Sequence, residues 1–154
     1  NQTDLSRGES KELIDTYYAT YPKLRKYIND QIHFAREHGY VQTVLGRRRY
    51  LNDINSRNAV VRGAAERNAV NAPIQGSATD IIKIAMIHIH NKLEASNYKT
   101  KMLLQVHDEL VFDVYKPELE IIKTMVKNEM EQAYTLSVPL DVDLGFGADW
   151  LEAH

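Results

Sequence analysis

The segment LLQVHDELVFDV, residues 103 to 114, places three ionisable side chains, His107, Asp108 and Glu109, between two runs of strand-forming residues. Alternating apolar residues on both sides predict two strands that anchor this tip. The tip contains none of the glycine, asparagine or proline residues that tight hairpin turns favour, which points to a chemical role. The alternative is an ordinary solvated turn.

The two carboxylates of this tip suggest metal binding. Adjacent strand residues point to opposite sides of a sheet, so Asp108 and Glu109 cannot serve one cation equally, and Asp108 is the better candidate ligand. A hard cation such as magnesium takes one or two protein carboxylates and fills its other positions with water and phosphate oxygens. A complete site therefore needs a second carboxylate from elsewhere.

A second set of polar side chains lies upstream, where Arg67, Asn71 and Gln75 are spaced four apart and share one helix face. Amide groups can donate to the minor-groove acceptors that all base pairs display, and so can check the shape of a pair without distinguishing its sequence. Arginine adds a phosphate or groove contact. The alternative is the polar flank of an ordinary surface helix, and spacing alone does not decide between them.

Five further arginines precede this face, at Arg47, Arg48, Arg49, Arg57 and Arg62. Together with Arg67 they give the segment 46–67 a local balance of +4, whereas the segment 108–154 has a balance of −8. Such segregation lets one surface face an anionic polymer while another holds cations, and a cluster of arginines suits phosphate binding. The alternative is ordinary solvated surface charge.

The composition sets broader limits. The chain has 154 residues with 44% hydrophobic content, which suits one compact domain or a piece of a larger one. Cysteine is absent, so any metal must be held by oxygen or imidazole, and a reducing cytoplasm is the expected compartment. No apolar run approaches a membrane span and no signal pattern opens the chain, so we expect a soluble, unexported protein with no membrane partner.

The first third of the sequence predicts two helices and a hairpin. Ser6 with Glu9 matches a capping box at the start of the first helix. Pro22 suits the first turn of the second helix, and Gly39 ends it. Residues 40–45 and 48–51 predict a short hairpin, followed by a loop over residues 52–56.

The remainder predicts helices around the central hairpin. Residues 58–94 have helical periodicity, but Pro73 should kink or break them into two stretches, with a restart at Ser77. His88 and His90 are interpreted as core or surface histidines of this helix. Pro117 should open another helix through about residue 135, and LDVDL at 140–144 alternates like a strand. This order describes an α+β fold with an antiparallel sheet covered by helices.

QVHDELVF also resembles the carboxyl-terminal palm motif of family A DNA polymerases. Three other segments are similar to that family in the same order: GYVQTVLGRRRYLNDINSRN, RGAAERNAVNAPIQGSATDIIKIAM and VPLDVDLGFGADW. The resemblance covers nearly the whole chain. It implies that residues 1–154 are one carboxyl-terminal fragment of a polymerase domain, with an antiparallel palm sheet packed with helices and a helical segment from the end of the fingers. The carboxyl terminus resembles a natural end, and the amino terminus resembles a cut.

The resemblance also implies roles for single residues. Asp108 would be a catalytic metal ligand, Glu109 an auxiliary acidic residue and His107 a neighbour of the primer end. Arg67, Asn71 and Gln75 match positions that touch template and primer. The family's other catalytic aspartate and its triphosphate-binding fingers helix have no match in these residues.

The implied activity is DNA-templated DNA synthesis in replication and repair. Its partners are primer-template DNA and deoxynucleoside triphosphates, its cofactor is Mg²⁺ in a two-metal site, and its expected location is the bacterial cytoplasm, at the nucleoid. The fragment alone is predicted to be inactive because half of the metal clamp is missing. Two alternatives are a non-catalytic nucleic-acid-binding module and a piece of a single-subunit RNA polymerase, which fits RGAAERNAVNAPIQG less well.

Overall fold

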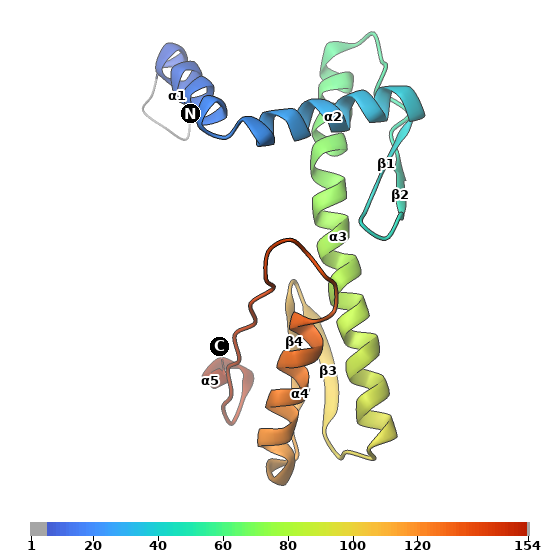
Figure 1. The fold of residues 1–154 in the computed structure, drawn as a ribbon, viewed down its shortest axis with the longest axis vertical. Helices are drawn as coiled ribbons and strands as arrows, with labels where there is room; N and C mark the ends of the chain where they lie inside the picture. Colours follow the sequence, from blue (N-terminus) through green and yellow to red (C-terminus); the bar gives the residue numbers. More distant parts are fainter. Residues whose placement is uncertain (1–5, 154) are drawn as a thin grey trace. The chain divides into compact units, whose positions relative to one another are not determined.

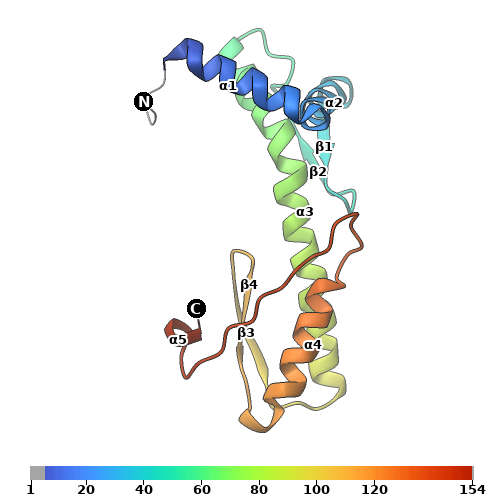
Figure 2. The same ribbon diagram turned by 60° about the vertical axis from the view of Figure 1, so that its left-hand side comes forward.

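A computed structural model describes residues 6–153, apart from the side chain of Arg7. The chain divides into two compact units, Asn1–Gly76 and Ser77–His154, which are described separately (Figures 1 and 2). Each unit contains an antiparallel hairpin and helices, so the predicted α+β class is confirmed. Within residues 6–153, no helix combines the length and apolarity that crossing a membrane requires.

The first unit begins with helices α1 (Arg7–Thr20) and α2 (Pro22–His38). The predicted capping box is present: the Glu9 amide donates to Ser6 Oγ at 3.3 Å, and the Ser6 amide donates to Glu9 Oε2 at 2.8 Å. Gly39 ends α2 with φ +78°, and its amide donates to the Ala35 carbonyl. Both predicted helix boundaries are therefore confirmed by the local chemistry that suggested them.

The β1–β2 hairpin follows, with strands Tyr40–Gln42 and Arg48–Tyr50, and the loop over 52–56 is also as predicted. The core of this unit combines residues from α2, the hairpin, the loop and the next helix. Its buried members are Ala35, Val41, Leu51, Ile54, Ala65, Ala69 and Ala72. Most of these side chains are small, which lets the backbones of the elements approach closely.

Helix α3 (Ala59–Ala95) contradicts the predicted break at Pro73, because the helix continues through this residue without a restart at Ser77. A proline inside a helix removes one hydrogen bond and costs about 3 kcal/mol. Tertiary packing around it offsets this cost, since the preceding turns bury alanines in the core. The Tyr27 hydroxyl also donates to the Val70 carbonyl at 3.1 Å, and partial burial raises the pKa of this hydroxyl.

The second unit contains strands β3 (Lys101–Val106) and β4 (Glu109–Asp113), which form the predicted central hairpin. The register shifts between Met102 and Leu104, which places one extra residue on β3. One face packs on a core that α3 and the following helix supply. That core contains Ile89, Leu93, Ile122 and Val126, with Met102, Leu110 and Phe112 packed against it.

Two predictions about the end of the chain are wrong. After the short 3₁₀ helix η1 (Lys116–Glu118), helix α4 (Leu119–Glu131) ends several residues before position 135. The LDVDL segment forms no strand, and two side chains of α4 bond the backbone of its central residue, Val142. Lys127 Nζ donates to the Val142 carbonyl at 2.9 Å, and the Val142 amide donates to Glu131 Oε1 at 3.4 Å. A last short helix, α5 (Trp150–Ala153), follows.

Candidate nucleic-acid interface and metal site

The tip of the β3–β4 hairpin is a two-residue turn made by His107 and Asp108, because Val106 and Glu109 are already paired. His107 has φ +54°, whereas Asp108 is not among the described residues with positive φ. This sign pattern is that of a type II′ turn, whose first position usually holds glycine. A histidine there is uncommon and is more strained than glycine. The turn therefore carries a histidine side chain at a position where the backbone conformation favours glycine.

A neighbouring side chain holds this turn. Gln105 Nε2 donates to the His107 carbonyl oxygen at 2.6 Å. The contact links β3 to the backbone of the turn that carries Asp108. The side chains of His107 and Asp108 are exposed, and Glu109 is half-buried. Asp108 lies in the turn and not on a strand, so strand alternation is not what separates it from Glu109.

The donor chemistry of the tip fits part of a magnesium site. Asp108 offers an exposed carboxylate, and magnesium prefers oxygen ligands with several positions left to water or phosphate. Among residues 6–153, no group of three or more histidine, aspartate or glutamate side chains is arranged to hold a metal ion. Asp108 would therefore be one ligand of a site that needs a further carboxylate from another part of the protein.

The opposite end of the hairpin is fixed by Glu118. Its carboxylate accepts the backbone amides of Lys99 and Thr100, both at 3.0 Å, and the Thr100 hydroxyl at 2.7 Å. Thr100 Oγ1 in turn accepts the Tyr115 amide at 3.2 Å. Desolvation alone raises the pKa of Glu118, but these hydrogen bonds and the nearby Lys99 charge outweigh it, so the pKa lies below its ordinary value. Glu118 thus ties both strands to η1 in its ionised form.

In the first unit, the predicted arginine cluster is attached to α3 by a close backbone contact. Arg47 Nη2 donates to the Gly76 carbonyl at 3.0 Å, and the Arg47 amide donates to Thr43 Oγ1 at 3.2 Å. A Cβ at Gly76 would lie 2.5 Å from Thr43 Cγ2 and 3.3 Å from Arg47 Nη2. A glycine is therefore required for the hairpin to sit this close to the helix.

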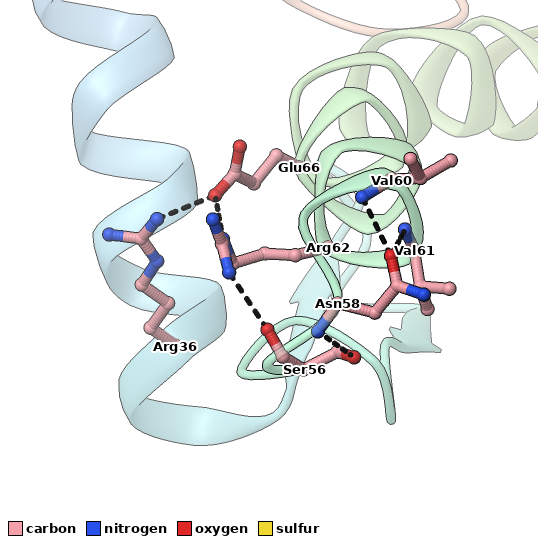
Figure 3. A network of polar contacts seen from close by, with 7 residues as sticks. All are labelled: Arg36, Ser56, Asn58, Val60, Val61, Arg62 and Glu66. Carbon is pink, nitrogen blue, oxygen red and sulfur yellow. Dashed lines mark hydrogen bonds and ion pairs between the residues drawn. The ribbon is translucent and has the colours of Figure 1, made fainter.

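The remaining arginines differ in their surroundings. Arg48, Arg49, Arg57 and Arg67 are exposed, as phosphate binding requires. Arg62 is half-buried: its Nη1 donates to the Ser56 carbonyl at 2.9 Å, and its Nε lies 3.7 Å from Glu66 Oε1. Glu66 also pairs with Arg36 of α2 at 2.6 Å (Figure 3). Arg62 thus holds the loop before α3, and a direct contact of this residue with nucleic acid stays a prediction.

Asn58 fixes the start of α3 in the same network. Its Oδ1 accepts the amides of Val60 and Val61 at 3.0 and 3.4 Å, and its own amide donates to Ser56 Oγ (Figure 3). This is the geometry of an N-cap. The cap fixes the residue at which α3 begins, upstream of the face that carries Arg67, Asn71 and Gln75.

That polar face has the predicted geometry. Arg67, Asn71 and Gln75 all lie on α3 and are all exposed, whereas Ala65 and Ala72 are buried in the core. Both this face and the arginine cluster belong to the first unit, while His107, Asp108 and Glu109 belong to the second. Sequence reasoning missed Gly76 and Gln105, although a helical glycine and a polar residue between strand apolars were both visible signals.

Comparison with known proteins identifies the family to which this chain belongs. The sequence model of DNA polymerase family A matches residues 1–152, and the chain belongs to this family. Among its relatives, DNA polymerase I of Streptococcus pneumoniae is 54% identical over 153 residues, which are 99% of this chain and 17% of the relative. DNA polymerase I of Caldicellulosiruptor bescii is 48% identical over 148 residues, which are 96% of this chain and 17% of the relative.

A solved structure is also similar. The POL domain of Pol1 from M. smegmatis, in complex with DNA primer-template and dNTP, superposes with a TM-score of 0.95 at 45% identity. The match covers 99% of this chain and 27% of that one. The chain thus spans about a sixth of the length of the curated relatives it matches, which cover 17% each.

Proposed function

We propose that this chain works as part of a longer DNA polymerase that performs DNA-templated DNA synthesis. The observation that carries the proposal is the exposed Asp108 in a hairpin turn that Gln105 holds by a hydrogen bond. The chain that carries this turn matches DNA polymerase family A over residues 1–152. The substrates are primer-template DNA and deoxynucleoside triphosphates. The chain would supply the end of the fingers and much of the palm, and the protein would act in the cytoplasm at the nucleoid.

In this proposal, some residues of the chain hold the cation and others hold DNA. Asp108 would hold Mg²⁺ through its carboxylate, and a second aspartate outside this chain would complete the pair of metal sites. Bound magnesium supplies activation of the primer 3′ hydroxyl and charge neutralisation at the leaving pyrophosphate. Gln105 would steady the backbone of the turn that carries Asp108 through its bond to the His107 carbonyl. Glu109 adds negative charge beside it, and His107 lies next to the primer end.

The first unit would hold the nucleic acid. Exposed amides of Asn71 and Gln75 can donate to the minor-groove acceptors that every base pair displays, so they would test pair shape. The exposed arginines would neutralise backbone phosphates and make binding salt-dependent. These contacts would orient the primer end. Correct orientation can lower the activation free energy of nucleotide addition by several kcal/mol.

The test is Asp108→Ala in the full-length protein. Loss of a metal ligand should lower the rate of nucleotide addition about 10³-fold or more, while the affinity for primer-template DNA stays unchanged. Asp113→Ala is the matched control, since Asp113 is exposed on the same hairpin but lies opposite Lys101 in the strand register, at the end away from the turn. Parallel extension assays with ribonucleoside triphosphates test whether the protein prefers deoxynucleoside triphosphates.

Near-normal extension by Asp108→Ala would reject the metal role. If the protein bound DNA but neither variant nor native protein extended a primer, a non-catalytic nucleic-acid-binding module would replace the polymerase assignment.

A further inference from the structure

A row of aromatic rings runs from the end of α2 onto the outward face of the β1–β2 hairpin. Phe34 and His38 stack with centroids 4.1 Å apart and planes 14° apart. Tyr40 meets the edge of Phe34 at 5.6 Å, and Tyr50 lies 5.8 Å from Tyr40. Tyr40 and Tyr50 are directly paired across the hairpin, so the row is fixed by strand register.

The last ring of the row is open to solvent. Tyr50 is 67% exposed, whereas Val41 on the opposite face of the hairpin is buried. The Arg48 guanidinium lies over the Tyr40 ring at 4.4 Å, and Arg48 shares the outward face with Tyr50 because they are two residues apart. A large ring is thus held from one side, uncovered on the other, and flanked by positive charge.

We propose that this face is a stacking platform for an unpaired base of the bound nucleic acid, with Tyr50 stacking on the base and Arg48 neutralising an adjoining phosphate. An exposed aromatic ring beside cations is the arrangement that binds single strands, because every base has a π-face and every nucleotide carries a negative charge. Bases within a duplex are covered on both faces by their neighbours, so only an unpaired base fits. This inference rests on the proposed function and adds a subsite to it.

The arginines favour nucleic acid over an apolar protein partner. Arg47, Arg48 and Arg49 are consecutive and exposed next to Tyr50, and no acidic residue lies between positions 40 and 50. An apolar partner would have to remove these charges from water, which is unfavourable without matching anions. Phosphates supply those anions on both sides of each base.

The experiment compares two primer-template probes with the full-length protein. Both carry a short unpaired template overhang, but in one probe the overhang is made of abasic nucleotides. The two overhangs have the same phosphates, so any difference in affinity reports contact with the bases. The native protein should bind the base-containing probe about fivefold more tightly or better, and this ratio should persist when salt is raised, although both affinities fall.

Tyr50→Ala should remove most of that ratio, and Tyr50→Phe should retain it because the ring remains. Tyr50→Leu keeps an apolar strand residue without a π-face, so it should also lose the ratio and decides the matter if Tyr50→Ala fails to fold. The matched control is Tyr115→Ala: Tyr115 is 45% exposed and has Lys99 Nζ 4.7 Å from its ring, but it lies in the second unit. This control should keep the ratio.

Equal binding of both probes by the native protein would overturn the platform, as would an undiminished ratio in Tyr50→Leu. A fully duplex probe and the Asp108→Ala extension assay are run alongside. If duplex binding and Asp108-dependent extension are normal, only the platform is rejected. If both are absent, the proposed function itself fails, and the platform fails with it.

Discussion

The two hairpins of this chain are built by different means. The β1–β2 hairpin has strands of three residues each, carries arginines, and reverses direction through Gly46 at φ +78°. The β3–β4 hairpin has strands of six and five residues, carries an acidic tip, and reverses through His107 at φ +54°. The first uses glycine where the backbone needs a positive φ, and the second places an ionisable side chain there.

The difference shows where each hairpin obtains its stability. The short basic hairpin buries Val41 in the core of the first unit, and it also depends on close contact with α3 at Gly76 and on a favourable turn. The long acidic hairpin packs on a core of aliphatic residues and is tied to η1 by Glu118, so it can tolerate a strained turn. A functional tip can depart from local preference when the strands below it are well anchored.

The largest expected effect comes from breaking the contact of the basic hairpin with α3. Gly76→Ala places a methyl 2.5 Å from Thr43 Cγ2, and Thr43 is buried, so overpacking should destabilise the hairpin by about 1–3 kcal/mol. Hydrogen exchange of residues 40–50 measures this local free energy of opening.

Two controls define the cause of that loss. Gly63→Ala lies on the same helix with no atom nearer than 3.8 Å to the added Cβ, so it should be neutral or stabilising. Adding Thr43→Ser to Gly76→Ala removes the clashing methyl but keeps the hydroxyl, and should restore most of the stability. An unrescued double variant would show that the clash is not the cause.

The two turns should respond to glycine in opposite ways. Gly46→Ala imposes a left-handed conformation on a side chain and should cost about 1–2 kcal/mol, although no atom lies within 4 Å of the added Cβ. His107→Gly should stabilise the β3–β4 hairpin by up to about 1 kcal/mol, after the greater flexibility of glycine in the unfolded chain is subtracted. Hydrogen exchange of each hairpin reports both changes, and a loss of stability in His107→Gly would contradict the strain at this turn.

A smaller effect is expected from Gln105→Leu, which removes the hydrogen bond to the His107 carbonyl. The net value of such a bond is about 0.5–1.5 kcal/mol, and we expect the lower end because the side chain is exposed. Primer extension by the full-length protein should slow about two- to fivefold with unchanged DNA affinity. Gln132→Leu, an exposed glutamine after α4, is the control; equal effects of both substitutions would remove the bracing role.

The smallest effect concerns pH, and in the acidic hairpin it arises at Glu118. The pKa of Glu118 is lowered in the folded protein, so its ionised form contributes stability above the unfolded pKa of about 4.3, and this contribution is lost as the pH falls through the folded value. The Tm difference between the native protein and Glu118→Gln should therefore shrink in acid. Glu120→Gln, which removes an exposed carboxylate of the neighbouring helix α4, is the control.

The sequence predicted the features that depend on neighbouring residues. The Ser6–Glu9 capping box, the end of α2 at Gly39 and both hairpins are confirmed, because capping and strand alternation act over a few residues. The shared face of Arg67, Asn71 and Gln75 is confirmed for the same reason, since it follows from helical periodicity alone.

The failures involve contacts between segments distant in sequence. Continuity through Pro73 depends on packing against α2, and a strand at 140–144 requires a neighbouring strand that is not found among the described residues. The strained turn at His107 and the approach at Gly76 also depend on partners that no local pattern reveals. The metal-binding role of Asp108 and the DNA contacts were inferred from residue types and spacing, the family resemblance added the catalytic roles, and all of them stay predictions.

The two cores are completed at different times during synthesis, although helix α3 contributes residues to both. Its first half supplies Ala65, Ala69 and Ala72 to a core whose other members precede them in the chain. Its second half supplies Ile89 and Leu93, whose partners Ile122 and Val126 come later. At about 5–20 residues per second, a ribosome would leave these two side chains uncovered for a few seconds after the first core is complete. The apolar side chains of the second core are therefore exposed for longer during synthesis than those of the first.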